Sequence, residues 1–498
     1  MSSVNTEYGR IVGEKADGVH RFLGVPYAAA PTGALRWRAP QPPTPWDGER
    51  VATSFAPMAV QAHGPAELTP VESEDCLYLN VWTPAPDREV RQPVLVWFHG
   101  GGFLGGTTRD PVIDGSNLAR LGATVVTVGY RLGVFGFLTD TEAGANFAVL
   151  DWIAALNWVR ANIAEFGGDP DNVTIFGQSA GAAAVRTLLH SPSARDLYHR
   201  AIIQSAGFED FAAVESPSYE RAAEATRNLR ERLGALTVDE MRDRPAHLVR
   251  AAASPLSGTF PQPGEVHTPA NLVWHPVSDG LIVETGALDG CGPELPILVS
   301  CTEQESRFFC RPDGVYARPD LQPDDVYTWP TTTAMAHRLA GTAAEELLDH
   351  YRSSGFTPYE ALTDLMTAAI WHEPEDAALQ RFAGAGRPVY SARFAKTSIE
   401  NRRSGMRAFH TADIPYVFGN VANVAEYDES DREISADVMS GWLSFARDGV
   451  PRNGSDAPWV PYTLEAPRRT LIGHDVTSVP IEQSVAVRLI GGARDAIR

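Results

Sequence analysis

The fold class of this chain is indicated most clearly by Val173-Thr-Ile-Phe-Gly-Gln-Ser-Ala-Gly181. Its first four residues are β-branched or aromatic and predict a short buried strand. The stretch 180–189 is rich in Ala and Leu and predicts a helix. The five residues Gly177-Gln-Ser-Ala-Gly181 therefore form a tight turn between strand and helix, and the small residues flanking the serine let the two elements approach closely.

Ser179, at the centre of this turn, is a candidate nucleophile. The N-terminus of the predicted helix offers unpaired N–H groups and the positive end of its dipole, where negative charge develops when a serine attacks a carbonyl. Because Gly-x-Ser-x-Gly is short, a glycine-rich connection with an incidental serine is the alternative interpretation. The strand before the turn and the helix after it favour the nucleophile.

Other short apolar runs predict further strands of the same sheet. They are nearly continuous rather than alternating, which is typical of parallel strands buried on both faces. Between two of them lies a helical pattern that places Leu150, Ile153, Ala154, Trp158 and Ala161 on one face. Strands alternating with helices predict an α/β fold, with a mostly parallel central sheet flanked by helices. The predicted strands are 94–98, 124–128, 173–176, 201–203 and 297–299.

The chain shows no stretch that reads as an interdomain linker, so residues 1–498 are expected to form a single domain. Residues 333–385 have a mainly helical pattern and are expected to cover one end of the sheet. Residues 255–276 are rich in Pro and Gly and are expected to form a surface loop.

A second glycine motif, His99-Gly-Gly-Gly-Phe103, follows the predicted strand 94–98. Glycines let backbone amides face a substrate carbonyl, since no Cβ blocks its approach. The amides of Gly101, Gly102 and Ala180 are therefore candidates for an oxyanion hole. A flexible glycine-rich loop is one alternative. A phosphate-binding P-loop is excluded because no Gly-Lys-Ser/Thr follows.

The composition restricts the class of partner. Asp and Glu number 62 against 42 Lys and Arg, a formal charge of −20, and this excess repels nucleic acids and anionic membranes. No apolar run approaches twenty residues and the N-terminal residues lack a secretory signal pattern, so no membrane association is expected. The cysteines are few, which favours free thiols and a cytoplasmic location; they are Cys76, Cys291, Cys301 and Cys310.

These motifs and several others together resemble the type-B carboxylesterases, the family of cholinesterases and bacterial para-nitrobenzyl esterases. The similarity runs over nearly the whole length of the chain. It is carried by Phe22-Leu-Gly-Val-Pro-Tyr-Ala28, Glu74-Asp-Cys-Leu-Tyr-Leu-Asn80, Tyr130-Arg-Leu-Gly133, Phe166-Gly-Gly-Asp-Pro170, Ala408-Phe-His-Thr-Ala-Asp-Ile-Pro-Tyr-Val-Phe-Gly419, Trp442-Leu-Ser-Phe-Ala446 and Trp459-Val-Pro-Tyr462.

The resemblance implies the α/β-hydrolase fold and a catalytic triad. The histidine of the family matches His410, and its acid matches Glu305 in Thr302-Glu-Gln-Glu-Ser306. The order Ser179, Glu305, His410 is that of α/β-hydrolases. Gln304 and Ser306 replace the usual Asp and Gly, and Glu303 is the neighbouring alternative acid.

The resemblance also implies structural roles for other charged residues. Arg36 is expected to pair with Glu74 and Arg131 with Asp151, and Asp413 is expected to be structural. Phe147, Ala148 and Trp152 depart from the family pattern, and they either reshape the packing below the site or belong to a core that is packed differently. Residues expected to line the substrate pocket are Phe103, Leu104 and those near Phe308.

Together these features predict a serine hydrolase that cleaves small-molecule carboxylic esters through an acyl-enzyme, without a metal or organic cofactor, as a monomer or weak homo-oligomer. Activity is expected to fall at acid pH as His410 is protonated, since free imidazole titrates near about 6.5. Two alternatives stay open. One is a hydrolase of carbamates or activated amides with the same fold, and the other is a non-catalytic binding member, which the retained triad disfavours.

Overall fold

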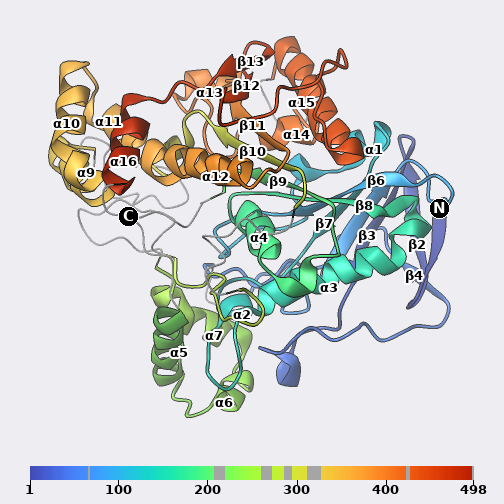
Figure 1. Cartoon of the computed structure of the whole chain (residues 1–498). Coiled ribbons are helices and arrows are strands. Elements are labelled where there is room, and N and C mark those ends of the chain that lie inside the picture. The colour runs from blue at the N-terminus through green and yellow to red at the C-terminus, as the bar shows by residue number, and fades with distance from the viewer. Residues whose placement is uncertain are drawn as a thin grey trace.

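The protein is described by a computed structural model that covers residues 1–64, 68–206, 219–258, 272–284, 294–310, 327–421 and 427–495. One large sheet runs through the molecule, with helices on both sides (Figure 1). Its strands are β1 (Ser2–Thr6), β2 (Gly9–Ala16), β3 (Val19–Pro26), β4 (Glu49–Val51), β5 (Tyr78–Thr83), β6 (Gln92–Phe98), β7 (Thr124–Val128), β8 (Gly168–Gln178), β9 (Arg200–Gln204), β10 (Ile297–Thr302), β11 (Val389–Phe394), β12 (Arg468–Ile472) and β13 (Val476–Pro480).

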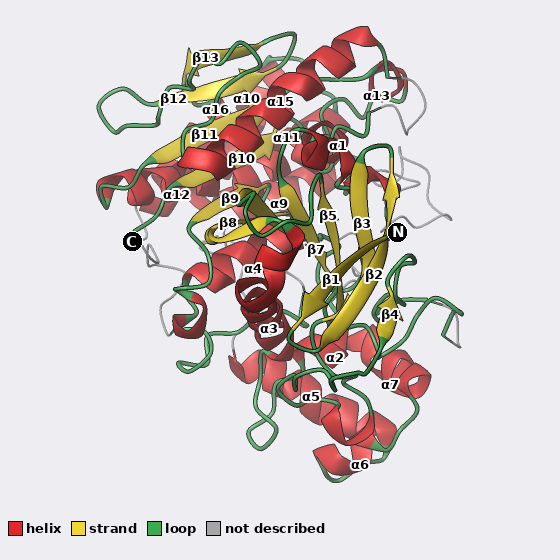
Figure 2. Cartoon of the chain, turned by 90° about the vertical axis from the view of Figure 1, so that its right-hand side faces the viewer, coloured by secondary structure: helices red, strands yellow, loops and turns green. Residues whose placement is uncertain are grey.

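The strand order is β1-β2-β3-β5-β7-β6-β8-β9-β10-β11-β12-β13, with β4 beside β2. From β7 to β12 every neighbouring pair is parallel, whereas the pairs among β1, β2, β3, β5 and β7, and the pair β12–β13, are antiparallel. The sheet is strongly twisted, as the change of strand direction between β3 and β12 shows (Figure 2). All five strands predicted from the sequence lie in the parallel part, so the predicted α/β-hydrolase architecture is confirmed.

Alternate residues of the central strands enter two separate hydrophobic cores. In β6, Val94, Val96 and Phe98 face one core and Leu95 and Trp97 face the other. Every residue of β6 is buried, which explains why the apolar run is continuous rather than alternating.

Helices cover both faces of the sheet. Helices α3 and α4 pack with the first core and α1, α14 and α15 with the second. The helices are α1 (Ser116–Arg120), α2 (Gly133–Phe137), α3 (Phe147–Asn162), α4 (Ala180–Leu189), α5 (Tyr219–Leu233), α6 (Val238–Arg242), α7 (Ala246–Ala253), α9 (Trp329–Ala340), α10 (Ala344–Ser353), α11 (Pro358–Thr367), α12 (Glu373–Gly384), α13 (Ile399–Arg403), α14 (Ile414–Val417), α15 (Glu429–Asp448) and α16 (Val485–Asp495). The helical pattern predicted for 333–385 is confirmed by α9 to α12.

Two sequence predictions about burial are wrong in part. In α3 the predicted inner face includes Ala161, which is exposed, while Phe147, Trp152 and Leu156 outside that face are buried. The reason is that α3 is enclosed by β8, α2 and α4 and buries most of its circumference. The predicted surface loop 255–276 ends in 272–276, which is buried; residues 259–271 lie outside the described residues.

The predicted charged pairs form as expected. Arg36 donates two hydrogen bonds of 2.6 Å to Glu74, and Arg131 binds the two carboxylate oxygens of Asp151 at 2.6 and 2.8 Å. Cys76, Cys301 and Cys310 are buried free thiols, as predicted, whereas Cys291 lies outside the described residues.

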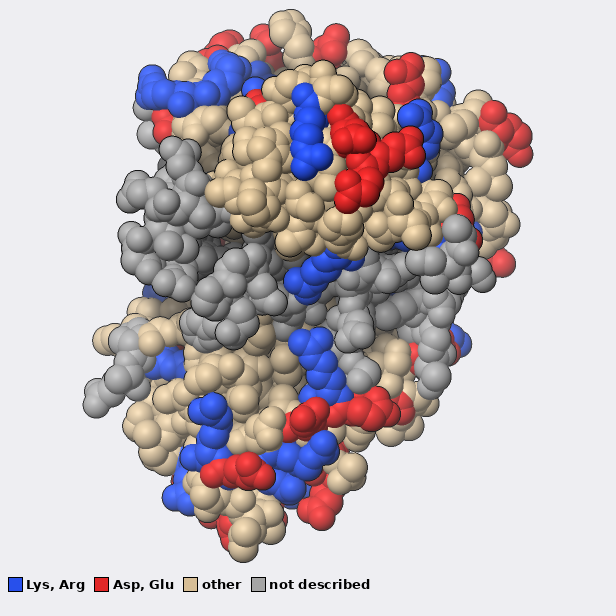
Figure 3. Space-filling model, turned by 90° about the vertical axis from the view of Figure 1, so that its left-hand side faces the viewer, with Lys and Arg blue, Asp and Glu red and all other residues tan. Residues whose placement is uncertain are grey.

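The surface carries both signs of charge. On the face shown in Figure 3, basic and acidic side chains lie interspersed in small groups. Within the described ranges, no helix is both long enough and apolar enough to span a membrane.

Candidate active site

The predicted site residues lie in segments that follow the carboxyl ends of the parallel strands. Gly100 to Gly102 follow β6, Ser179 directly follows β8, Glu305 is the third residue after β10, and His410 lies farther along, in the loop after β11 and α13. Parallel strands end at one edge of a sheet, so segments that are far apart in sequence meet there, and this edge is where open α/β sheets bind ligands.

The backbone at Ser179 has φ 57° and ψ −125°, a conformation that L-residues rarely adopt. Close packing around the turn explains the strain. A Cβ on Gly181 would lie 1.9 Å from the carbonyl oxygen of Phe98, so the first turn of α4 lies directly against the end of β6. The turn thus presents the serine at the sheet edge with the N-terminus of α4 beside it.

His410 and Glu305 form a buried hydrogen-bonded pair. The Nδ1 of His410 lies 2.5 Å from Oε2 of Glu305, and the two residues are 2 % and 0 % exposed. A carboxylate oxygen accepts, so Nδ1 carries a hydrogen and donates it to Glu305, and Nε2 is the ring nitrogen that is left over. The alternative acid, Glu303, instead approaches Arg393 at 3.6 Å with a half-exposed side chain, so the geometry favours Glu305.

The other oxygen of Glu305 is held by two donors that the sequence did not indicate. The hydroxyl of Ser205 and the backbone N–H of Thr302 each donate to Oε1 at 2.7 Å. Ser205 directly follows β9 and has a positive φ of 50°. The predicted strand 201–203 ends two residues earlier, and that nearness alone does not distinguish Ser205 from other serines.

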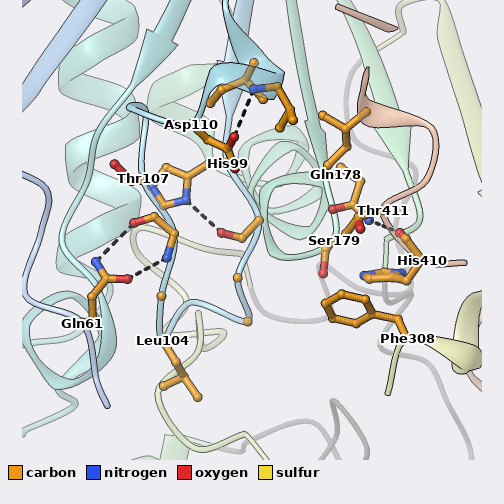
Figure 4. Close-up of a pocket in the computed structure, with 18 of the residues that line it drawn as sticks. Gln61, His99, Leu104, Thr107, Asp110, Gln178, Ser179, Phe308, His410 and Thr411 are labelled. Atoms are coloured by element: carbon orange, nitrogen blue, oxygen red, sulfur yellow. Dashed lines mark hydrogen bonds between the residues drawn. The ribbon is translucent and has the colours of Figure 1, made fainter. Parts of the chain in front are cut away.

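Ser179 and His410 line the same cavity, and Figure 4 shows their side chains next to each other. The hydroxyl of Ser179 is not hydrogen-bonded to the ring, because Nε2 of His410 has no partner within the described part of the chain. Catalytic hydrogen bonds are often long in free enzymes and tighten when substrate binds.

Three backbone N–H groups beside Ser179 are available to a ligand. Those of Gly101, Gly102 and Ala180 donate to no acceptor among the described residues. Gly101 has φ 112°, and a Cβ there would lie 2.2 Å from the oxygen of Gly105, so only glycine fits the loop. The fold of this loop is fixed by Gln61, whose side chain binds both the N–H and the carbonyl of Gly106 at 2.8 and 3.2 Å.

Burial sets the charge of two neighbouring groups. It lowers the pKa of His99 to about 4, so the ring that stacks on Tyr130 beside the glycine loop is neutral at pH 7. Burial also raises the pKa of Asp413 to about 6, although Gln204 donates a 2.8 Å hydrogen bond to that carboxyl. Asp413 thus has a structural partner, as expected, and does not bind His410.

The cavity has a volume of about 590 Å³ and is mainly apolar. Within the described residues its lining includes no Lys or Arg, and Asp110 is its one acidic residue. Its apolar lining residues are Trp97, Leu104, Val112, Ile113, Leu272, Phe308, Phe309 and Ile414.

Of the predicted pocket residues, Leu104 and Phe308 line the cavity, but Phe103 does not. The ring of Phe103 points into the core, where it packs on Phe137 and Trp152 with ring centroids 4.9 and 5.9 Å apart. Trp152 also packs on Phe98 and Tyr130, so its ring belongs to the core beneath the glycine loop. Among the described side chains no cluster of three His, Cys, Asp or Glu could hold a metal ion.

Known proteins resemble this chain over nearly its whole length. The model of the carboxylesterase family matches residues 1–486. Para-nitrobenzyl esterase of Bacillus subtilis (strain 168) is 33% identical over 497 residues, covering 95% of each chain. Phenmedipham hydrolase of Pseudarthrobacter oxydans is 29% identical over 95% of this chain and 96% of that protein. A solved structure of PNB esterase has a TM-score of 0.81 and 31% identity, and the match covers 98% of this chain and 99% of that one.

Proposed function

Because the chain belongs to the carboxylesterase family and is an ester hydrolase, we propose that Ser179, His410 and Glu305 are its catalytic triad. The observation that supports this best is the buried pair of His410 and Glu305, which shares one edge of the sheet with a strained serine. The pair leaves Nε2 of the ring as an acceptor on the side of the cavity.

In the first half of the reaction, Nε2 of His410 accepts the proton of the Ser179 hydroxyl as its oxygen attacks the ester carbonyl. General base catalysis of this kind contributes about 10²- to 10⁴-fold. Glu305 fixes the tautomer of the ring and stabilises the imidazolium that forms. The bond to the alcohol then breaks, and the imidazolium protonates the departing oxygen.

The tetrahedral intermediate carries a negative oxygen, and the N–H groups of Gly101, Gly102 and Ala180 are proposed to bind it. The described residues offer these N–H groups no competing backbone acceptor. Loss of one such donor typically costs about 3–4 kcal/mol of transition-state stabilisation. Water then releases the acid from the acyl-enzyme, again with His410 as base. No cofactor takes part in this scheme.

The substrate class follows from the cavity. Its apolar walls suit an uncharged acyl or aryl group, and its described lining offers no cation to bind an anionic substrate. A second candidate activity is the hydrolysis of carbamates, favoured by the similarity to phenmedipham hydrolase over nearly the whole chain. Acylation of Ser179 is common to both activities, so the substrate panel decides between them. A cytoplasmic location and a monomeric or weakly associated state stay predictions.

The proposal is tested with p-nitrophenyl esters of increasing acyl length, one aryl carbamate, phenmedipham and one anilide. The same panel is run on Ser179→Ala and on the control Ser353→Ala, which changes an exposed serine of α10. We expect the wild type and Ser353→Ala to hydrolyse esters equally, and Ser179→Ala to lose at least about 10³-fold in kcat.

Labelling with a p-nitrophenyl phosphonate gives an independent readout, because the reagent should add to Ser179 alone and mass spectrometry of peptides locates it. Turnover that survives in Ser179→Ala, or a label on another residue, would refute the triad. Hydrolysis of the carbamates alone would favour the second activity, and a complete lack of turnover and labelling would favour a non-catalytic binding role.

A further inference from the structure

A short π-helix, η10 (Ala368–His372), joins α11 to α12 and packs against the proposed triad. π-helical turns are rare in proteins, but where they occur they often lie at functional sites. Two consecutive residues of this π-helix face the site. The ring of Trp371 lies 5.5 Å from that of His410, and His372 contacts the end of β10. The first contact is simple packing, whereas the second has a specific hydrogen-bond pattern.

His372 joins two groups of opposite character. Its Nδ1 lies 3.0 Å from Nη1 of Arg393, and its Nε2 lies 2.9 Å from the carbonyl oxygen of Thr302. A guanidinium can only donate, so Nδ1 must accept, and the single hydrogen of the neutral ring is therefore on Nε2. Burial and the positive charge of Arg393 lower the pKa of His372 well below its usual value, which keeps the ring neutral.

The side chain of Arg393, which donates to His372, is itself held in place by its strand and by an ion pair. It lies on β11, the parallel neighbour of β10, and faces Cys301 in register. Its Nη2 donates to Glu375 at 2.6 Å, and Glu375 is fully buried. His372 therefore links the buried ion pair of Arg393 and Glu375 to Thr302, the last residue of β10.

The end of β10 is where the geometry of Glu305 is set. The N–H of Thr302 donates to Oε1 of Glu305. In the next peptide, between Thr302 and Glu303, the carbonyl oxygen accepts from His372, and the N–H donates to the carbonyl oxygen of Phe394 at 2.8 Å. The peptide between Thr302 and Glu303 is therefore held from both sides. A rotation of this peptide would change the backbone angles of Thr302 and Glu303, and with them the course of the turn that carries Glu305.

We propose that His372 is a positioning residue, which orients the Thr302 peptide so that Glu305 keeps its short hydrogen bond to His410. This inference rests on the proposed triad, and it adds a residue that touches neither substrate nor the reacting atoms. The path runs from Arg393 through His372 and Thr302 to Glu305.

A matched pair of substitutions separates the two contacts of His372. In His372→Asn the amide reaches the position of Nδ1 and can still accept from Arg393, but it is too short to reach Thr302. In His372→Gln the longer amide reaches the position of Nε2 and restores the donor to Thr302. Both variants keep a polar group beside the guanidinium, so neither leaves it unsatisfied. The control is Asp376→Asn, which loosens the bond from Arg469 in the same buried ion network but does not contact β10.

For each variant kcat and KM are measured per titrated active site, together with the pH profile of kcat/KM. We expect His372→Asn to lower kcat about 10- to 100-fold, as small misplacements of catalytic groups do, with KM changed less than about twofold. The acid limb of its profile should move to lower pH, because a looser Glu305 stabilises the imidazolium less. His372→Gln should regain most of the activity, and Asp376→Asn should lower the melting temperature without moving the limb.

A readout without substrate keeps the test independent of the proposed function. The proton shared by His410 and Glu305 should give a far-downfield NMR resonance in the wild type and His372→Gln, and a shifted or missing one in His372→Asn. An unchanged resonance and pH profile in His372→Asn, or equal damage by Asn and Gln, would overturn the positioning role. If the wild type hydrolyses no ester, the proposed function fails, but the resonance still decides the role of His372.

Discussion

The buried pair of Arg131 and Asp151 offers a sharp test of which charges are structural. Arg131 is 3 % exposed and Asp151 0 %. Besides its two side-chain bonds to Asp151, the guanidinium of Arg131 donates to the carbonyl oxygens of Arg38 and Phe147 at 2.9 and 3.0 Å. In Arg131→Met the aspartate stays buried without its cation and two carbonyls lose a donor, so we expect a loss of about 3–5 kcal/mol in the free energy of unfolding.

The expected change in melting temperature is small for such a loss. At about 2.1 cal/mol/K of unfolding entropy per residue, a chain of 498 residues unfolds with roughly 1 kcal/mol/K, so the midpoint should fall by about 3–5 °C. The assay is calorimetry with urea unfolding monitored by tryptophan fluorescence. The kcat of the folded variant at 20 °C should equal that of the wild type, since Arg131 contacts no residue of the proposed triad.

Two further variants control the reasoning. Arg131→Met combined with Asp151→Leu removes both charges and should regain most of the lost stability, because no unpaired charge is left. Arg432→Met breaks an exposed pair with Glu429 and should change stability by less than about 1 kcal/mol. An unchanged melting temperature with lost activity in Arg131→Met would refute the structural assignment. So would a double variant whose loss of unfolding free energy equals the sum of the losses in the two single variants.

Three other predictions follow from the site and its packing. Burial raises the pKa of the Asp413 carboxyl from 3.8 to about 6, so between these pH values the folded state holds a proton that the unfolded state releases; the free energy of unfolding should therefore fall by at most about 3 kcal/mol as the pH rises through this window. Asp413→Asn should reduce this pH dependence, measured by melting curves between pH 4 and 7. An unchanged pH dependence in the variant would contradict the prediction. Ser205→Ala removes one donor to Glu305 and should lower kcat about tenfold at unchanged KM, measured with a p-nitrophenyl ester. Gly181→Ala forces a Cβ against Phe98 and should prevent recovery of folded protein, whereas Gly492→Ala, in open space on α16, should be tolerated.

The parallel part of the sheet could be predicted because its strands are buried on both faces. The run 124–128 coincides with β7, and 94–98 lacks only the first two residues of β6. The strands at the two sides of the sheet, β1 to β5 and β12 to β13, were not predicted, and neither was the parallel strand β11. Strands β1, β2, β4 and β13 have partly exposed residues. Strands β5 and β11 are buried, but polar residues interrupt their apolar runs. That residues 1–498 form one domain stays a prediction.

Local sequence patterns indicated some residues of the candidate site but not others. Ser179 and the glycine loop follow strands directly, so local patterns identified them. His410 and Glu305 are 105 residues apart in sequence, and no local pattern relates them; only the resemblance to a family did so. Ser205 was missed because a serine after a strand has no distinguishing pattern until its hydroxyl is seen to meet a carboxylate.

His410 lies in a loop that is held by hydrogen bonds from the ends of neighbouring strands. The serine and the acid sit close to rigid strands, but His410 belongs to a loop after β11 and α13. Three glutamines at the ends of neighbouring strands fasten that loop: Gln178 donates to the His410 oxygen at 3.1 Å, Gln204 to Asp413 at 2.8 Å, and Gln304 exchanges two bonds with Ala408 at 2.9 and 3.1 Å. An amide both donates and accepts without titrating. These bonds to the loop do not depend on whether the imidazole is neutral or charged, which suits the role of base that is proposed for His410.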